Sequence, residues 1–108
     1  MLNQEEDVLK EIFVKVGKGS TKGFDIPKAV VNHYRIESGD GIRCVLKEKL
    51  DIDMENAKKI DKEILIDVDD SHPTRGHISE GTCKLYNIGD GHYLRLLIKA
   101  VIHKRQRV

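Results

Sequence analysis

Two segments of the chain, spaced by about 50 residues, repeat one pattern. Glu-Ile-Phe-Val-Lys-Val at 11–16 corresponds to Glu-Ile-Leu-Ile-Asp-Val at 63–68. Further along, each copy contains a tyrosine, an isoleucine two residues later and then a Gly-Asp-Gly turn. The turn lies at 39–41 in the first copy and at 89–91 in the second, and the second copy has two residues fewer between the isoleucine and the turn. An apolar-rich run containing a lysine follows each turn. An internal repeat of this period indicates that one supersecondary unit is duplicated within the fold.

The order of predicted elements is the same in both copies. Each begins with a β-branched strand, continues through a polar turn into a short second strand and a short helix, and ends in a longer apolar strand. At 108 residues the chain corresponds to one domain. We divide residues 1–108 into a first pseudo-repeat at 11–49, an acidic linker helix at 50–62, a second pseudo-repeat at 63–102 and a basic tail at 103–108, with a short helix predicted over 2–10.

The helix of the first copy has the clearer pattern. Pro27 suits the first helical position, where its missing N–H is not needed. Val30 and Tyr34 are four residues apart and would both face the core. In the second copy Gly81 and Thr82 weaken the helical pattern, which predicts a shorter helix or a turn.

Charge is unevenly distributed along the chain, although the net charge is only +1. The linker region is acidic, and Asp53 is predicted to cap a helix over 54–61 by accepting an orphan backbone N–H. Residues 92–108 contain five Lys or Arg and no Asp or Glu. This segregation predicts separate acidic and basic faces, of which the basic one would attract phosphates; a mixed, solvated surface with a basic tail is the alternative.

Two features indicate the compartment. No apolar run approaches the roughly 20 residues of a membrane span, and the N-terminus is acidic, unlike that of a signal peptide. We therefore expect a cytoplasmic protein without membrane association. Cys44 and Cys83 lie in or near predicted core segments and are expected to be buried free thiols.

The first copy contains, in this order, Phe24-Asp25-Ile26-Pro27-Lys28, a short helix, Tyr34-Arg35-Ile36 and Gly39-Asp40-Gly41-Ile42. This arrangement resembles the AbrB/MazE/SpoVT family, in which two chains exchange hairpins to close a swapped-hairpin barrel that binds DNA. The second copy departs from the pattern, because Ile78-Ser79-Glu80 stands where Ile-Pro-Lys is expected.

Two fused copies would close such a barrel within one chain. The chain is then similar to the cradle-loop barrels of the RIFT and double-psi types, found in archaeal CTP-dependent riboflavin kinases and in N-domains of some AAA ATPases. Closure is favoured because one half alone would leave open strand edges. The expected fold is mainly β with short helices, a small closed six-stranded cradle-loop-type barrel built from two pseudo-repeated ββαβ-like halves. Chance similarity between two β-rich segments is the alternative.

The family resemblance implies phosphate contacts at basic residues of the first strand, the glycine-rich turn and the start of the helix: Lys15, Lys18, Lys22 and Lys28. Lysines and exposed backbone N–H groups suit phosphate oxygens and give salt-sensitive affinity. In the second copy Asp67, Asp69 and Asp70 stand at the matching positions, and Arg75 alone keeps a positive charge. A symmetric DNA surface within one chain is therefore not expected.

Other chemistry finds little support in the residues. The segment 17–23 is rich in glycine but lacks the spacing of a phosphate-binding P-loop. His72, His77 and Cys83 match no common zinc pattern, and no nucleophile–base–acid set is evident. We therefore predict no catalytic residue, metal or cofactor, and an enzyme of riboflavin-kinase type is the weakest of the three hypotheses.

Two hypotheses about function remain. The first is an AbrB-like, transcription-regulator-like protein that binds nucleic acid. The alternative is a monomeric cradle-loop barrel that binds a nucleotide-like ligand or a protein partner. The sequence leaves the choice between monomer and homodimer open.

Overall fold

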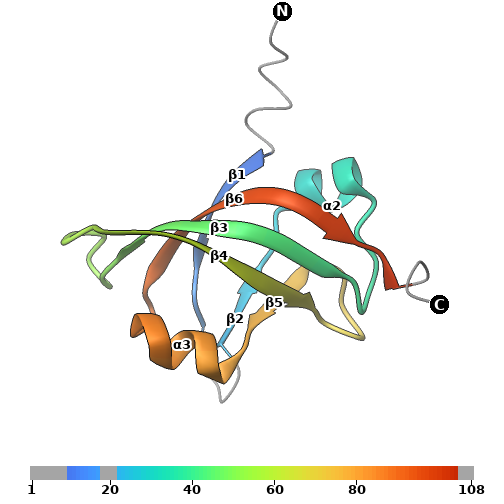
Figure 1. Ribbon diagram of the computed structural model, residues 1–108. Coiled ribbons are helices and arrows are strands. Elements are labelled where there is room, and N and C mark those ends of the chain that lie inside the picture. Colours follow the sequence, from blue (N-terminus) through green and yellow to red (C-terminus); the bar gives the residue numbers. More distant parts are fainter. Residues whose placement is uncertain (1–9, 18–21, 105–108) are drawn as a thin grey trace, which may run out of the picture.

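The computed structural model describes residues 10–17 and 22–104. In this part of the chain, six strands and two short helices follow one another in a ββαβ–ββαβ order (Figure 1). In chain order they are β1 (Glu11–Lys15), β2 (Lys22–Asp25), α2 (Lys28–Tyr34), β3 (Gly41–Leu50), β4 (Lys58–Val68), β5 (Arg75–Ile78), α3 (Glu80–Tyr86) and β6 (Tyr93–Ile102). The predicted ββαβ-like order of both halves is confirmed.

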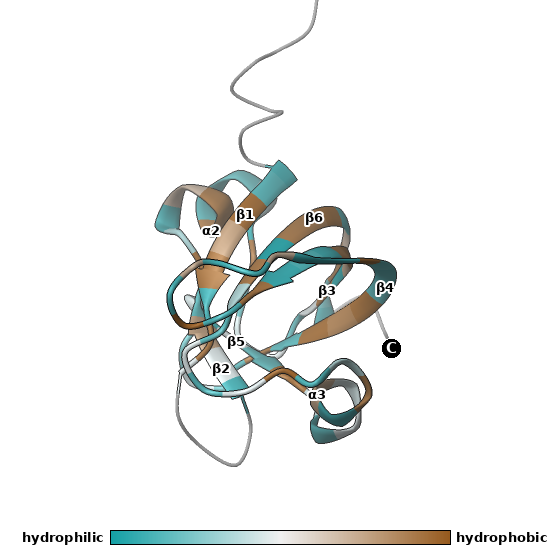
Figure 2. Ribbon diagram, turned by 90° about the vertical axis from the view of Figure 1, so that its left-hand side faces the viewer, coloured by the Kyte–Doolittle hydropathy of each residue, from teal (hydrophilic) through white to brown (hydrophobic). Residues whose placement is uncertain are grey.

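The strands form one antiparallel sheet in the order β1-β6-β3-β4-β5-β2. The sheet curls on itself, so that Figure 2 shows the strands arranged around a ring with α2 and α3 outside it. The two edge strands meet at one hydrogen bond, in which Gly17 N–H donates to Gly23 C=O at 2.7 Å. A six-stranded barrel within a single chain is thus confirmed, and it is nearly closed rather than fully closed.

The two halves interlock and correspond residue by residue. α2 and α3 begin 52 residues apart, at Lys28 and Glu80, and β3 and β6 begin with the same spacing. β1 pairs with β6 from the other half, just as β4 pairs with β3. The hydrogen bonds between the halves repeat with this spacing as well. Neither half can therefore satisfy its strand edges without the other.

The two Gly-Asp-Gly sequences do not occupy equivalent positions, so their predicted alignment is wrong. Gly39 corresponds to Gly91, and both have a positive φ, 84° and 82°. Each donates its N–H to the end of a strand from the other half, Gly39 to Val68 C=O at 3.2 Å and Gly91 to Val16 C=O at 2.8 Å. These bonds set the position of each turn. With Gly39 aligned to Gly91, the two copies align without the two-residue gap that the Gly-Asp-Gly alignment requires.

Alternating apolar residues fill the interior of the barrel. Ile42, Cys44 and Leu46 of β3 are all buried, as the alternation predicts. Val30 is buried and Tyr34 packs against the core, which confirms the inward face of α2. Both cysteines are buried and free, as predicted. Within the described residues, no helix has the length and apolar character needed to cross a membrane.

The predicted acidic linker helix is wrong. The segment is instead a β-hairpin turn, because Asp51, and not Asp53, captures the backbone: its carboxylate accepts the N–H of Asp53 and of Glu55, at 3.1 and 2.9 Å. Met54 and Asn56 adopt positive φ values, which are incompatible with a right-handed helix. β4 then begins at Lys58 and extends the pairing with β3.

The second helix is longer than predicted. α3 has seven residues, as many as α2. Ser79 caps it by accepting the backbone N–H of Thr82 at 3.3 Å, a signal that outweighs the low helix propensity of Gly81. The helix predicted over 2–10 falls almost wholly outside the described residues. The same is true of the basic tail beyond Lys104.

Candidate nucleic-acid interface

An aromatic and basic group lies on the outer face of β1 and β6. In the register of this strand pair, Phe13 lies opposite Arg95 and Lys15 lies opposite Tyr93. Side chains alternate between the two faces of a strand. Because Ile12 is buried, its neighbour Phe13 points outward, together with the other three residues. We call Phe13, Lys15, Tyr93 and Arg95 the aromatic platform.

The platform has a defined geometry. The rings of Phe13 and Tyr93 stack with centroids 5.3 Å apart and an interplanar angle of 12°. Lys15 Nζ lies 5.8 Å from the centroid of the Tyr93 ring, and Arg95 Cζ lies 5.7 Å from that of Phe13. Phe13 is 40% exposed, which is high for a large apolar residue. Phe13 therefore presents a ring to solvent, stacked on the half-buried Tyr93, with a cation against each ring.

The two cations differ in how they are compensated. Arg95 Nε lies 2.9 Å from Glu48 Oε1, and its Nη1 lies 3.9 Å from Glu11 Oε1. Lys15 forms no ion pair with a carboxylate of the described residues. Lys15 therefore keeps a positive charge that an anionic ligand can use.

The pseudo-symmetric face on β4 and β3 provides an internal comparison. The residues there that correspond to Phe13, Lys15, Tyr93 and Arg95 are Leu65, Asp67, Gly41 and Arg43. Arg43 keeps its acidic partner, with Nε 3.0 Å from Glu63 Oε1. The barrel thus forms without the stacked rings and without the lysine on this second face. The fold itself does not require the aromatic platform.

The residues predicted to contact phosphate are not gathered in one place. Lys15 belongs to the platform, while Lys18 lies outside the described residues. Lys22 is half-buried and pairs with Asp90 across the turn of the other half. Lys28 is exposed at the start of α2.

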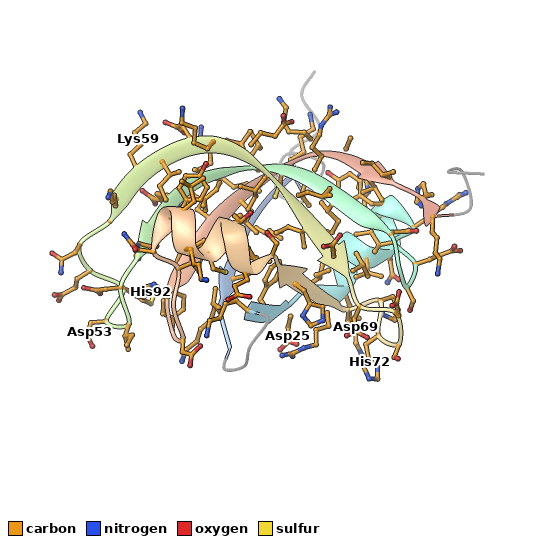
Figure 3. The ribbon with its side chains drawn as sticks, turned by 60° about the horizontal axis from the view of Figure 1, so that its bottom comes forward. Asp25, Asp53, Lys59, Asp69, His72 and His92 are labelled. Atoms are coloured by element: carbon orange, nitrogen blue, oxygen red, sulfur yellow. The ribbon has the colours of Figure 1, made fainter. Side chains whose placement is uncertain are left out.

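Arg75 lies at the base of the glycine-rich turn. Its guanidinium packs against Gly23, so closely that a Cβ there would lie 2.9 Å from Arg75 Nη2. Arg75 Nη1 is 3.6 Å from Asp25 Oδ1, and this acid partly offsets its charge. Figure 3 shows Asp25 near Asp69 and His72, beside β2 and β5. This end of the barrel is of mixed charge, and it matches a phosphate site less well than the platform does.

Asp69 and His77 form a further pair at this end. His77 Nε2 lies 2.8 Å from Asp69 Oδ2, and Asp69 Oδ1 accepts the backbone N–H of Ser71 and of His72 at 2.7 and 3.2 Å. The bond to His77, with those from the backbone, lowers the pKa of Asp69 to about 2. In the described part of the chain, no three His, Cys, Asp or Glu side chains converge as metal ligands would. The pair therefore holds the loop before β5 in place.

Sequence reasoning missed Phe13, Tyr93 and Arg95. The alternation over β1 places Phe13 and Lys15 on one face, and this part of the platform could have been predicted from the sequence. Their partners are some 80 residues away on β6, and the register of two strands so distant in sequence is set by closure of the barrel.

The chain is similar in fold to a solved structure, the solution structure of PHS018 from Pyrococcus horikoshii, with a TM-score of 0.62 and 18% sequence identity. The match covers 90% of this chain and 96% of that chain. At this identity the similarity concerns the fold alone. No family model matches the chain, and no curated protein matches it.

Proposed function

We propose that this barrel binds nucleic acid through the aromatic platform. The observation that carries the proposal is the exposed Phe13–Tyr93 stack with the uncompensated Lys15 beside it. The resemblance of the first copy to the DNA-binding AbrB family gives independent support, since Lys15 is among the residues it implies. In this proposal the barrel does not require hairpins exchanged with a second chain.

Each platform residue has a role in the proposed contact. A base stacked on an aromatic side chain contributes about 1–3 kcal/mol. Lys15 would contact a phosphate, an interaction that weakens as salt rises because bound counterions are released. Lys15 now lies against the Tyr93 ring and would move outward to meet the backbone of the ligand, while Arg95 stays paired with Glu48 and Glu11.

The second candidate is the binding of a nucleotide-like ligand or a protein partner. It is favoured by the ion pairs of Lys22 with Asp90 and of Arg75 with Asp25, which reduce the positive charge available around the glycine-rich turn. Exposed aromatic and arginine side chains are also enriched at protein interfaces.

The test is fluorescence anisotropy with labelled oligonucleotides over a series of salt concentrations. We expect binding that weakens with salt and that Phe13→Ala reduces by about 5- to 150-fold, the value of one stacked base. Leu65→Ala is the matched control, since Leu65 is the equivalent exposed residue of the other half (46% exposed against 40% for Phe13). Absence of binding at low salt, or an equal loss in Leu65→Ala, would reject the proposal in favour of the second candidate.

A further inference from the structure

We infer that the ligand is a single strand of nucleic acid, which lies lengthwise on β1 and β6 from the aromatic platform to a second, basic subsite at Lys10 and Lys99. This inference rests on the proposed function and specifies its substrate class. Four observations support it: the stacked rings, the basic subsite, the row of outward residues between them and the contrast with the other half.

The rings favour a single strand over a duplex. In a double helix the base faces are covered by their neighbours, and only the edges reach the grooves. A ring of Phe or Tyr gains stacking energy only from a base that is free of that arrangement. The exposed Phe13–Tyr93 stack therefore suits unpaired bases.

The second subsite lies at the other end of the same strand pair. A shallow depression of about 220 Å³ is lined by Lys10, Leu97, Ile98 and Lys99. Both lysines are exposed, and neither forms an ion pair with a carboxylate of the described residues. Two ammonium groups without a carboxylate partner in the described part of the chain, beside a small depression that Leu97 and Ile98 also line, suit a phosphate and part of a sugar.

A row of outward residues on β6, among them the basic Arg95, connects the two subsites. The outward positions of β6 are those of Tyr93, Arg95, Leu97 and Lys99, and about 20 Å separates Tyr93 from Lys99 at the usual rise of a strand. Two acids also face this path, Glu11 opposite Leu97 and Glu48 on β3, and both lie within ion-pair distance of Arg95. A length of about 20 Å corresponds to the low end of single-strand site sizes, about four nucleotides.

The corresponding face on β3 and β4 differs from the β1–β6 face in the charges that would contact the ligand. The residues that correspond to Lys10 and Lys99 are Lys62 and Lys47, so the lysines recur. There, however, Lys47 Nζ lies 3.5 Å from Asp61 Oδ1, and Asp67 replaces the platform lysine. Of these two faces, it is β1–β6 that combines stacked rings with lysines that have no carboxylate partner among the described residues.

The experiment uses the full chain and oligo-dT of two, four, eight and twelve nucleotides, with oligo-rU of equal lengths and a duplex as comparison arms. We expect affinity to rise up to about four nucleotides and to change little beyond that. The variant K10A/K99A should reduce the slope of log affinity against log salt by about 1.4 for the twelve-nucleotide strand, because two phosphate contacts are lost. Its affinity for the dinucleotide, which reaches only the platform, should stay unchanged.

The variant K47A/K62A removes the two equivalent lysines of the other half and should behave as the wild type in every arm. A duplex bound as tightly as the single strand, or an unchanged salt slope in K10A/K99A, would overturn this inference while the proposed function stands. Absence of binding to any nucleic acid would overturn both.

Discussion

Asp40 and His92 occupy equivalent positions in the two halves of the barrel, and each accepts a hydrogen bond from the backbone N–H three residues earlier. Asp40 Oδ2 accepts from Glu37 at 2.8 Å, and His92 Nδ1 accepts from Gly89 at 2.9 Å. The same turn is therefore closed by a carboxylate in one half and by an imidazole in the other. Asp40 makes a further bond, in which its Oδ1 accepts the N–H of Lys104 at 2.7 Å and holds the chain just after β6.

This relationship predicts unequal roles for the two Gly-Asp-Gly aspartates. Asp40 is 1% exposed, and although burial alone would raise its pKa, hydrogen bonds from Lys104, Glu37 and His103 lower it. Asp40→Ala leaves buried donors without an acceptor and should lower the free energy of unfolding by about 2–3 kcal/mol, as measured by urea denaturation. Asp90→Ala, the control, removes only a partly exposed ion pair with Lys22 and should cost less than about 1 kcal/mol. Equal losses would mean that the two motifs are equivalent after all.

The Asp69–His77 pair predicts a loss of stability in acid. The folded-state pKa of Asp69, about 2, lies below its ordinary value, so ionised Asp69 stabilises the folded state. This contribution is fully present above about pH 4 and disappears as the pH falls through about 2. Urea denaturation from pH 5 to pH 2 should show a wild type that is more stable than Asp69→Asn at pH 5, with a difference that shrinks toward pH 2. A difference independent of pH over this range would contradict the assignment.

Two glycines should respond in opposite directions to alanine. A Cβ on Gly76 would lie 2.8 Å from Phe24 Cζ and 2.9 Å from Ile66 Cγ2, so Gly76→Ala forces core side chains apart and should cost about 1–3 kcal/mol. A Cβ on Gly81 meets nothing within 4 Å, and Gly81→Ala in α3 should stabilise the protein by about 0.5 kcal/mol. Thermal unfolding of the two variants and the wild type should show a lower melting temperature for Gly76→Ala and a higher one for Gly81→Ala. A neutral Gly76→Ala would show that β2 and β4 pack less tightly against this position.

The two thiols should be inert in the folded protein. Burial raises the pKa of Cys44 to about 12 and also raises that of Cys83, so little thiolate exists near pH 8. In a reaction with Ellman's reagent, we expect almost no colour from the native protein over minutes. After unfolding in urea, both cysteines should react. Rapid reaction of one thiol in the native state would place it at the surface.

Most of the secondary structure was predictable from local signals. β6 runs from Tyr93 to Ile102 as the apolar run indicates, and α2 follows Pro27 as expected. The linker was mispredicted because it contains several acidic residues, any of which could accept hydrogen bonds from backbone N–H groups. Which of them does so depends on where the β3–β4 pairing stops. Asp51 occupies that point, and the chain turns back into β4 there.

By itself, the sequence determined the repeated ββαβ order and the inward-facing residues of the strands, because these depend on periodicity and composition over short distances. The tertiary structure alone decided that the spacing of 52 residues seen between the first strands continues through the turns, by hydrogen bonds such as those of Gly39 and Gly91. It also decided that Phe13 stacks on Tyr93. The physical reason is the same in both cases: closing the barrel pairs strands from opposite halves, and that register depends on satisfying every strand edge at once.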